Sequence, residues 1–262
     1  ARQPGLHPVV RRNVLWNLQD REGSEYRAVK RAWHYLFEVW DTSKDFYEDW
    51  FSLTRRIDTE GWDGSIARAY ALVNRPRLQV STWPIINAPT ESTVHSIQDI
   101  FALEVAYPEH FETREVPVEW LPLVTRELRR NLDIAVTLEQ EVGGYRLHHL
   151  HPLAPDPSVE SDGFRDAGGL SGVIRSFTLH FDRLLVADAA AARREFLAWP
   201  NEGDIVVAQL RIWACSRSSL VSADEFGDLI ASLGQTCFWD SYLQRDLLTT
   251  LAGRWSELPE SA

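Results

Sequence analysis

Apolar residues recur at steps of three and four along most of this chain, and this spacing constrains the fold more than any other feature of the sequence. Residues at these steps lie on one face of an α-helix, with polar residues on the opposite face. The clearest stripes are Phe46, Trp50, Leu53 and Ile57; Ile66, Tyr70 and Val73; Leu121, Val124, Leu128, Leu132, Ala135 and Leu138; and Val173, Phe177, Phe181 and Leu184. A succession of amphipathic helices with almost no strand predicts an all-α fold.

Polar residues and glycines at the ends of these stripes indicate where individual helices begin and end. Asp188 and Asp204 precede helical stretches and can accept hydrogen bonds from the first N–H groups. Ser222 and Glu225 have the three-residue spacing of a capping box. The pair Gly143-Gly144 follows the longest stripe and predicts a left-handed stop. These signals divide the chain into many helices joined by short loops.

One segment departs from the helical pattern. The stretch LQVSTWPIINAP, residues 78–89, fits either a strand or an extended connector. Its two prolines favour the connector, because proline cannot donate the hydrogen bond that a strand ladder needs. Another helix is predicted to follow, indicated by Val94, Ile97, Phe101 and Val105 and closed by Pro108.

The C-terminal stretch beginning FWDSYLQRDLL is dense in aromatic, basic and acidic residues. Its apolar residues step by four: Trp239, Leu243, Leu247, Leu251 and Trp255, with Tyr242, Leu248 and Leu258 widening the stripe. We predict that this stripe faces the core and that the stretch is a packing layer.

We expect the helices to stack in pairs. Pairs of about 30–45 residues resemble HEAT-type solenoids in period, although no repeated sequence is legible. The prolines and acids of HPLAPDPSVESDG indicate a linker at residues 151–163. The predicted domains are therefore an N-terminal helical lobe at residues 1–150 and a C-terminal lobe of stacked short helices at residues 164–262.

Charge and composition exclude several classes of protein. The 262 residues carry a formal net charge of −11, which argues against nucleic acid as a partner because phosphate binding needs a clustered basic face. No apolar run approaches the roughly 20 residues that span a bilayer, and the N-terminus lacks the apolar run of a signal peptide. We expect a cytoplasmic protein without membrane contact. The chain starts at Ala1, so either an initiator methionine was removed or the chain is a piece of a longer protein. We favour the piece, because the first predicted helix begins almost at once and the last ends almost at the end of the chain.

The only dense group of potential metal ligands is formed by His148, His149 and His151 in the sequence RLHHLHP. Zinc needs three or four ligands that converge tetrahedrally, with the imidazoles held by further acceptors. Three histidines this close in sequence, with no cysteine nearby, favour a solvated loop. A metal site is the alternative, assisted by acids that follow in the chain. Those acids are Asp156, Glu160 and Asp162.

A second candidate is the run GGLSG at residues 168–172, which precedes a helix and can expose backbone N–H groups to an anion. The run lacks the lysine of a phosphate loop and follows no predicted strand, so we interpret it as a flexible helix start. Cys215 and Cys237 stand beside apolar residues and are predicted to be buried small hydrophobes. No catalytic motif and no cofactor-binding motif is recognisable.

Three stretches carry a family resemblance. They are LPLVTRELRRNLDIAVTLEQEVGGYRLHHLHPL, AAARREFLAWPNEGDIVVAQLRIWACSRSSLVSADEFGDLIASL and FWDSYLQRDLLTTLAGRWSELP. They resemble a helical region of unknown function found downstream of sirtuin-like domains in large bacterial anti-phage defence proteins. In those proteins the sirtuin-like domain hydrolyses NAD, and helical repeats hold subunits together or sense an invader. No catalytic residue of that family maps onto this chain, which has no glycine-rich dinucleotide fingerprint.

Our leading hypothesis is a non-catalytic helical scaffold or sensor module of such a defence protein, which acts through a protein partner or through self-association. It rests on the series of amphipathic helices and on the lack of a reactive constellation of residues. The alternative is a metal-dependent or small-molecule enzyme centred on the loop of residues 148–151. A domain that handles NAD by itself is a third hypothesis, and we expect no NAD loss with this chain alone.

Overall fold

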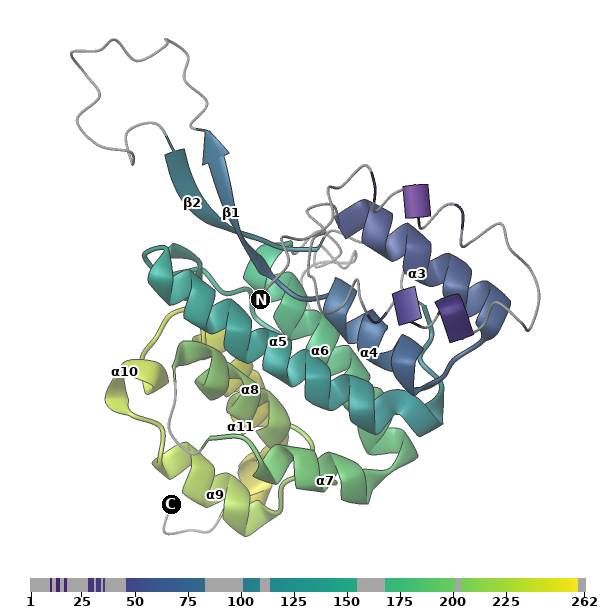
Figure 1. The fold of residues 1–262 in the computed structure, drawn as a ribbon. Helices are drawn as coiled ribbons and strands as arrows, with labels where there is room; N and C mark the ends of the chain where they lie inside the picture. The colour runs from purple at the N-terminus through teal and green to yellow at the C-terminus, as the bar shows by residue number, and fades with distance from the viewer. Residues whose placement is uncertain are drawn as a thin grey trace, which may run out of the picture. The chain divides into compact units, whose positions relative to one another are not determined.

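The computed structural model describes residues 46–82, 101–108, 114–154, 168–200 and 204–258, together with single helical positions between residues 10 and 35. These parts of the chain are mostly helical and contain one two-stranded sheet (Figure 1). The predicted all-α class is thereby confirmed. The predicted solenoid arrangement stays a prediction.

The chain divides into two compact units. The first comprises residues 1–73 and 108–116, and the second comprises residues 74–107 and 117–262. The long helix before residue 150 therefore belongs to the same unit as the helices after residue 168, which differs from the predicted lobes. The predicted linker at residues 151–163 is described only to residue 154 and otherwise lies outside the described residues.

In the first unit, α3 (Phe46–Glu60) packs against α4 (Gly64–Val73). The Asp63 carboxylate caps α4 by accepting hydrogen bonds from two N–H groups of the first turn, at 2.9 and 2.8 Å. The Tyr70 ring contacts Trp50 and Trp62, with centroids 5.9 and 5.6 Å apart. Trp50, Leu53, Ile66, Tyr70 and Val73 are buried, as their helical stripes predicted.

The second unit contains the sheet and the remaining helices. Its elements are β1 (Arg77–Thr82), β2 (Phe101–Ala106), η3 (Val118–Trp120), α5 (Leu121–Glu141), η4 (Tyr145–His148), α6 (Gly169–Ala187), α7 (Ala189–Leu197), α8 (Ile205–Cys215), α9 (Ala223–Ala231), α10 (Gln235–Phe238), α11 (Gln244–Arg254) and η6 (Trp255–Glu257). Helix α5 lies alongside α6, and α11 packs against α8 (Figure 1). None of the helices described is both long enough and apolar enough to cross a membrane.

Aromatic rings form much of the core of this unit. The Phe181 ring contacts Phe177, Trp199 and Trp213, with centroids 5.8, 5.4 and 5.6 Å away. Such tilted and edge-on pairs add to the stabilisation from burial. The predicted stripe of α5 faces the core, with Leu121, Val124, Leu128, Leu132 and Ala135 buried. Ala208, Ile212, Leu243 and Leu247 join α8 to α11.

The predicted helix ends are confirmed by their hydrogen bonds. Asp188 accepts from the N–H of Ala191, and Asp204 accepts from two N–H groups of α8. Ser222 and Glu225 form the predicted capping box of α9. Gly143 and Gly144 have φ of 107° and 71°, the left-handed conformation that stops α5.

The stretch predicted as a connector followed by a helix contains the sheet instead. β1 and β2 pair antiparallel, with Leu78 opposite Val105 and Val80 opposite Leu103. The helix predicted through Phe101 and Val105 is therefore wrong. The sequence FALEVA also alternates with period two, and pairing with β1 satisfies its backbone groups, so the strand prevails. The prolines of the connector lie beyond Thr82, outside the described residues.

The C-terminal stripe is only partly buried, which corrects the prediction of one packing layer. Leu243 and Leu247 are buried, whereas Trp239, Leu248 and Trp255 are 70%, 63% and 69% exposed. The helix is interrupted after α10, where the Asp240 carboxylate accepts from the N–H of Tyr242, so the step of four does not continue along one face. The last buried position of α11 is taken by Arg254, which donates to the Cys215 carbonyl.

Candidate functional site

The turn that follows α5 carries the histidines that the sequence singled out. Gly144 lets the chain reverse, and Leu147 and Leu150 are buried and anchor the turn to the unit. His148 is exposed, and so are His149 and His151. The predicted solvated loop is thus a short, well-anchored segment with exposed imidazoles.

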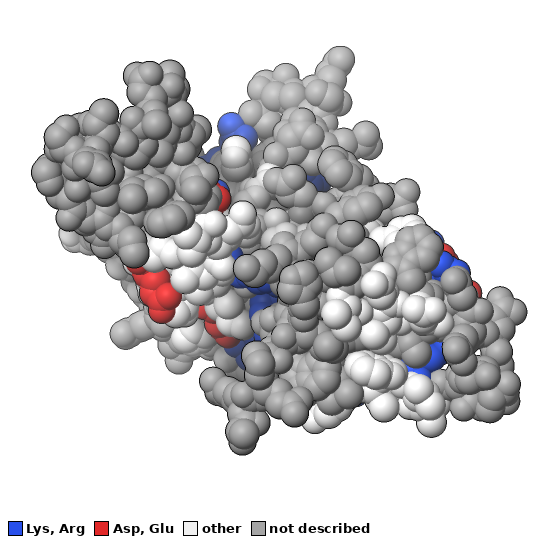
Figure 2. Space-filling view, turned by 45° about the horizontal axis from the view of Figure 1, so that its top comes forward, with Lys and Arg blue, Asp and Glu red and all other residues white. Residues whose placement is uncertain are grey.

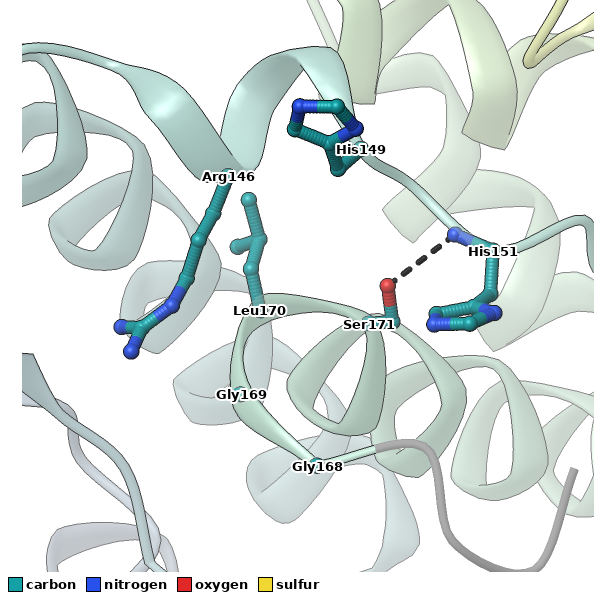
Figure 3. Close-up of a pocket in the computed structure, with 7 residues that line it drawn as sticks. All are labelled: Arg146, His149, His151, Gly168, Gly169, Leu170 and Ser171. Carbon is teal, nitrogen blue, oxygen red and sulfur yellow. Dashed lines mark hydrogen bonds between the residues drawn. The ribbon is translucent and has the colours of Figure 1, made fainter.

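The histidine loop at residues 148–151 and the glycine-rich run at residues 168–172 were separate candidates in the sequence. Both line one cavity of about 300 Å³. His149, His151 and Arg146 line it from the turn after α5, and the start of α6 lines it from the other side. In Figure 3 the Arg146 side chain extends away from the imidazoles of His149 and His151, and Leu170 stands between. His148 does not line the cavity. The lining residues at the start of α6 are its N-cap Gly168 and the helical residues Gly169, Leu170 and Ser171.

The first turn of α6 lines this cavity, and its first backbone N–H groups have no acceptor within the helix. Gly168 carries no side chain that could cap the helix, and the first main-chain bond of the turn runs from Gly172 N to Gly168 O at 3.4 Å. The N–H groups of Gly169, Leu170 and Ser171 precede that bond, as the first N–H groups of any α-helix do. Gly169 has φ of 66°, a conformation that other residues rarely adopt. The positive end of the helix dipole therefore lies at the cavity.

Arg146 is fixed beside the cavity by three contacts. Its Nη1 donates to the Val105 carbonyl at 2.8 Å and to Glu139 Oε1 at 3.2 Å. Its guanidinium lies over the Tyr107 ring, 5.2 Å from the centroid. The Glu139 carboxylate is 2% exposed and also accepts from the Tyr107 hydroxyl. Burial and the Glu139 carboxylate raise the pKa of Tyr107, so this phenol stays protonated.

His149 lies between two tyrosines. Its Nδ1 is 3.0 Å from the Tyr242 hydroxyl, and its ring meets Tyr242 edge-on with centroids 5.5 Å apart. The Tyr145 ring is 4.3 Å away on the turn itself. Because Tyr242 follows α10 in the chain, this contact links the turn after α5 to the C-terminal helices.

The backbone of His151 is tied to α6 and α8. Its N–H donates to Ser171 Oγ at 3.1 Å, which is the bond drawn in Figure 3. Its carbonyl accepts from Gln209 Nε2 at 2.8 Å. The Asp246 carboxylate of α11 holds the next residues, accepting from the N–H groups of Leu153 and Ala154. These bonds fix where the second imidazole enters the cavity.

Sequence reasoning missed Arg146, Tyr242 and Asp246. Asp246 had a usable signal, because it stands three residues after Leu243 on the core-facing side of its helix, where a carboxylate needs a partner. Val105, which accepts from Arg146, and His149, which contacts Tyr242, lie 41 and 93 positions away from these residues, and the sequence carries no sign of either contact.

The described part of the chain contains no cluster of potential metal ligands. No group of three or more His, Cys, Asp or Glu side chains there is arranged to hold a metal ion. Asp156, Glu160 and Asp162, the acids predicted to assist the histidines, lie outside the described residues. The metal-dependent alternative therefore stays a prediction.

The cysteines give no nucleophile. Cys215 is buried as predicted, and burial raises the pKa of its thiol to about 12. Cys237 is half-buried, and burial together with Asp240 and Asp204 raises the pKa of its thiol as well. Since the thiolate is the reactive form, both are poorly disposed to react.

Basic residues of the described surface are interspersed with acids. On the face drawn in Figure 2, lysine and arginine side chains lie in small separate groups among acidic and uncharged residues. Arg129 pairs with Glu195 at 2.7 Å, and Arg217 pairs with Asp182 at 2.6 Å. No continuous basic area is visible among the described residues on this face.

Comparison with known protein families, with curated proteins and with solved structures finds no match to this chain.

Proposed function

We propose that the second unit is a non-catalytic sensor module that binds a ligand through an anionic group at the start of α6. The observation that carries this proposal is the single cavity shared by Arg146, His149, His151 and the first turn of α6. It joins a permanent cation, two imidazoles and a helix N-terminus at one place.

The chemistry of the lining favours an anion over a cation. None of the described residues that line the cavity is acidic. Backbone N–H groups and the helix dipole stabilise negative charge at a helix N-terminus. Imidazole N–H groups add hydrogen-bond donors. The Glu139 carboxylate, which pairs with Arg146, already accepts from the Tyr107 hydroxyl and from Arg146.

Titration with inorganic phosphate tests the proposal. Binding is followed through the imidazole resonances of the purified protein, with sodium chloride at matched ionic strength as the reference. We expect saturable shifts at His149 and His151, and His151→Ala weakens binding about tenfold through loss of a bond to a charged group. His148→Ala is the matched control, because His148 is exposed and does not line the cavity. No saturable shift, or an equal loss in both variants, would contradict the proposal.

Self-association through α11 is a second candidate function. Leu248 of α11 and Trp255, which begins η6 directly after α11, are both largely exposed. Exposed apolar residues that lie close together mark interaction surfaces. Trp239, at the end of α10, is also exposed.

Light scattering after gel filtration tests this second function. We expect a dimer or larger species that Leu248→Glu converts to a monomer. Leu197→Glu is the control, since Leu197 of α7 is exposed to a similar degree, 64% against 63%. A monomer at every protein concentration would exclude self-association.

The resemblance to regions downstream of sirtuin-like domains leads us to propose a bacterial anti-phage setting for this module. In that setting, ligand binding to this module would regulate the activity of an NAD-hydrolysing domain. Sequencing the coding region upstream tests the setting, and a gene without a sirtuin-like domain would remove this support.

A further inference from the structure

We infer that Asp246 of α11 is a positioning residue for the cavity: its carboxylate holds residues 151–154 in place and thereby sets the approach of His149 and His151 to the bound anion. The inference rests on the proposed function, because it names the residue on which the affinity of that same cavity depends.

The Asp246 carboxylate is buried and accepts hydrogen bonds from the backbone after His151. It is 2% exposed, and its two oxygens accept from Leu153 N at 3.0 Å and from Ala154 N at 2.6 Å. A carboxylate leaves water only where other donors replace the hydration that it loses. Two successive N–H groups do so here, in charge-assisted bonds stronger than those between neutral groups.

Gln209 extends this hold to His151 itself. The side chain is fully buried, and its Nε2 donates to Asp246 Oδ2 at 3.0 Å and to the His151 carbonyl at 2.8 Å. Those two bonds use both hydrogens of the amide nitrogen. The carboxylate thus orients Gln209, and Gln209 in turn fixes the His151 backbone.

Tyr242 adds a parallel link four residues before Asp246. Its hydroxyl lies 3.0 Å from His149 Nδ1. Both histidines of the cavity are therefore connected to the C-terminal segment, one through its ring and one through its backbone. A displacement of α11 would move the two links together.

Packing alone would not hold this part of the turn. Leu150 is buried between the two histidines, but His151 is exposed and residues 152–154 are only half-buried. Side chains with little buried surface gain little from burial. Hydrogen bonds from α6, α8 and α11 must therefore decide where residues 151–154 lie.

The test compares Asp246→Asn with Asp228→Asn, the same change at an exposed aspartate of α9. The asparagine side chain has only one acceptor oxygen. Its NH₂ group replaces the second oxygen and faces N–H groups that the carboxylate accepted from. We expect amide hydrogen exchange at Leu153 and Ala154 to become about tenfold faster or more. The imidazole resonances of His149 and His151 shift, and the dissociation constant for inorganic phosphate rises about tenfold. Asp228→Asn changes none of these.

Tyr242→Phe is a second variant that tests the inference even if Asp246→Asn fails to fold. It removes one hydroxyl at a half-buried position, so the protein keeps its melting temperature. The His149 resonance should shift and phosphate binding should weaken about threefold, as expected for one lost neutral hydrogen bond.

The outcomes separate this inference from the proposed function. If the wild-type protein binds no phosphate, the proposed function fails, and the exchange rates and imidazole resonances still show whether Asp246 positions the histidines. Unchanged exchange at Leu153 and Ala154 in Asp246→Asn overturns the inference. Faster exchange spread evenly over α5 and α6 also overturns it, because that result assigns Asp246 a general structural role.

Discussion

The Tyr107 hydroxyl donates to Glu139 Oε1 across 2.5 Å, although 32 positions separate the two residues in the chain. Tyr107 follows β2 directly, and Glu139 lies near the end of α5. The bond therefore joins the sheet to the helix that leads into the cavity. Because Arg146 contacts both residues, it depends on this bond for its place at the cavity wall.

Tyr107→Phe should lower the free energy of unfolding by about 2 kcal/mol, because it leaves the buried Glu139 carboxylate without one of its donors. Urea unfolding measures the change. Tyr145→Phe is the matched control, since its ring is largely exposed and should tolerate loss of the hydroxyl. Equal stability of the two variants would show that the Tyr107 hydroxyl contributes nothing.

Stability should fall as the pH rises above 9, because of Cys215. Burial raises the pKa of this thiol from 9.0 to about 12, so the folded protein keeps a proton that the unfolded chain releases. Between pH 9 and about pH 12, ionisation of this thiol therefore favours the unfolded chain. The loss approaches about 1.4 kcal/mol per pH unit for one group.

Urea unfolding of the wild type and of Cys215→Ala between pH 9 and pH 10 isolates this effect, since the ordinary pKa of tyrosine is 10.0 and Tyr107 contributes only above it. The variant should show a flatter dependence on pH. Identical slopes would mean that the buried thiol does not keep its proton.

Alkylation should distinguish the two cysteines of the chain. Cys237 is half-buried and Cys215 is buried, so a thiol reagent should modify Cys237 first in the folded protein. Mass spectrometry of digested peptides locates the label. Both residues should react alike in urea, and early labelling of Cys215 without urea would refute its burial.

Asp204→Ala should cost about 1 kcal/mol of stability, because its carboxylate caps α8. Oδ1 accepts from Val206 N at 2.9 Å and from Val207 N at 3.1 Å. Thermal unfolding checks this loss. Asp228→Ala, at an exposed position of α9, should leave the melting temperature nearly unchanged, and a similar loss there would remove the cap as the cause.

The helices and their ends could be predicted because their signals are local. The buried face of α5 follows from the spacing of Leu121, Val124 and Leu128 alone. The cap at Asp204 likewise involves residues only two and three positions away. Both depend on backbone geometry that repeats within a few residues.

Predictions failed where the apolar spacing fitted more than one structure. Phe101 and Val105 fit a helical step as well as a strand, and β1 provides the hydrogen bonds that favour the strand. Trp239 and Trp255 fit a stripe that the break before α11 interrupts. The spacing of apolar residues predicts which face of a helix would be buried. It does not predict whether the helix continues without a break.

By itself, the sequence determined an all-α class, the helix caps, and two separate candidates at residues 148–151 and 168–172. Only the tertiary structure decided that His149, His151 and the start of α6 share one cavity with Arg146. The packing of α5 along α6 brings them together, and the bonds to Tyr242, Gln209 and Asp246 hold them there. Contacts between residues far apart in the chain depend on how whole helices pack, and the periodicity within each helix carries no record of its neighbours.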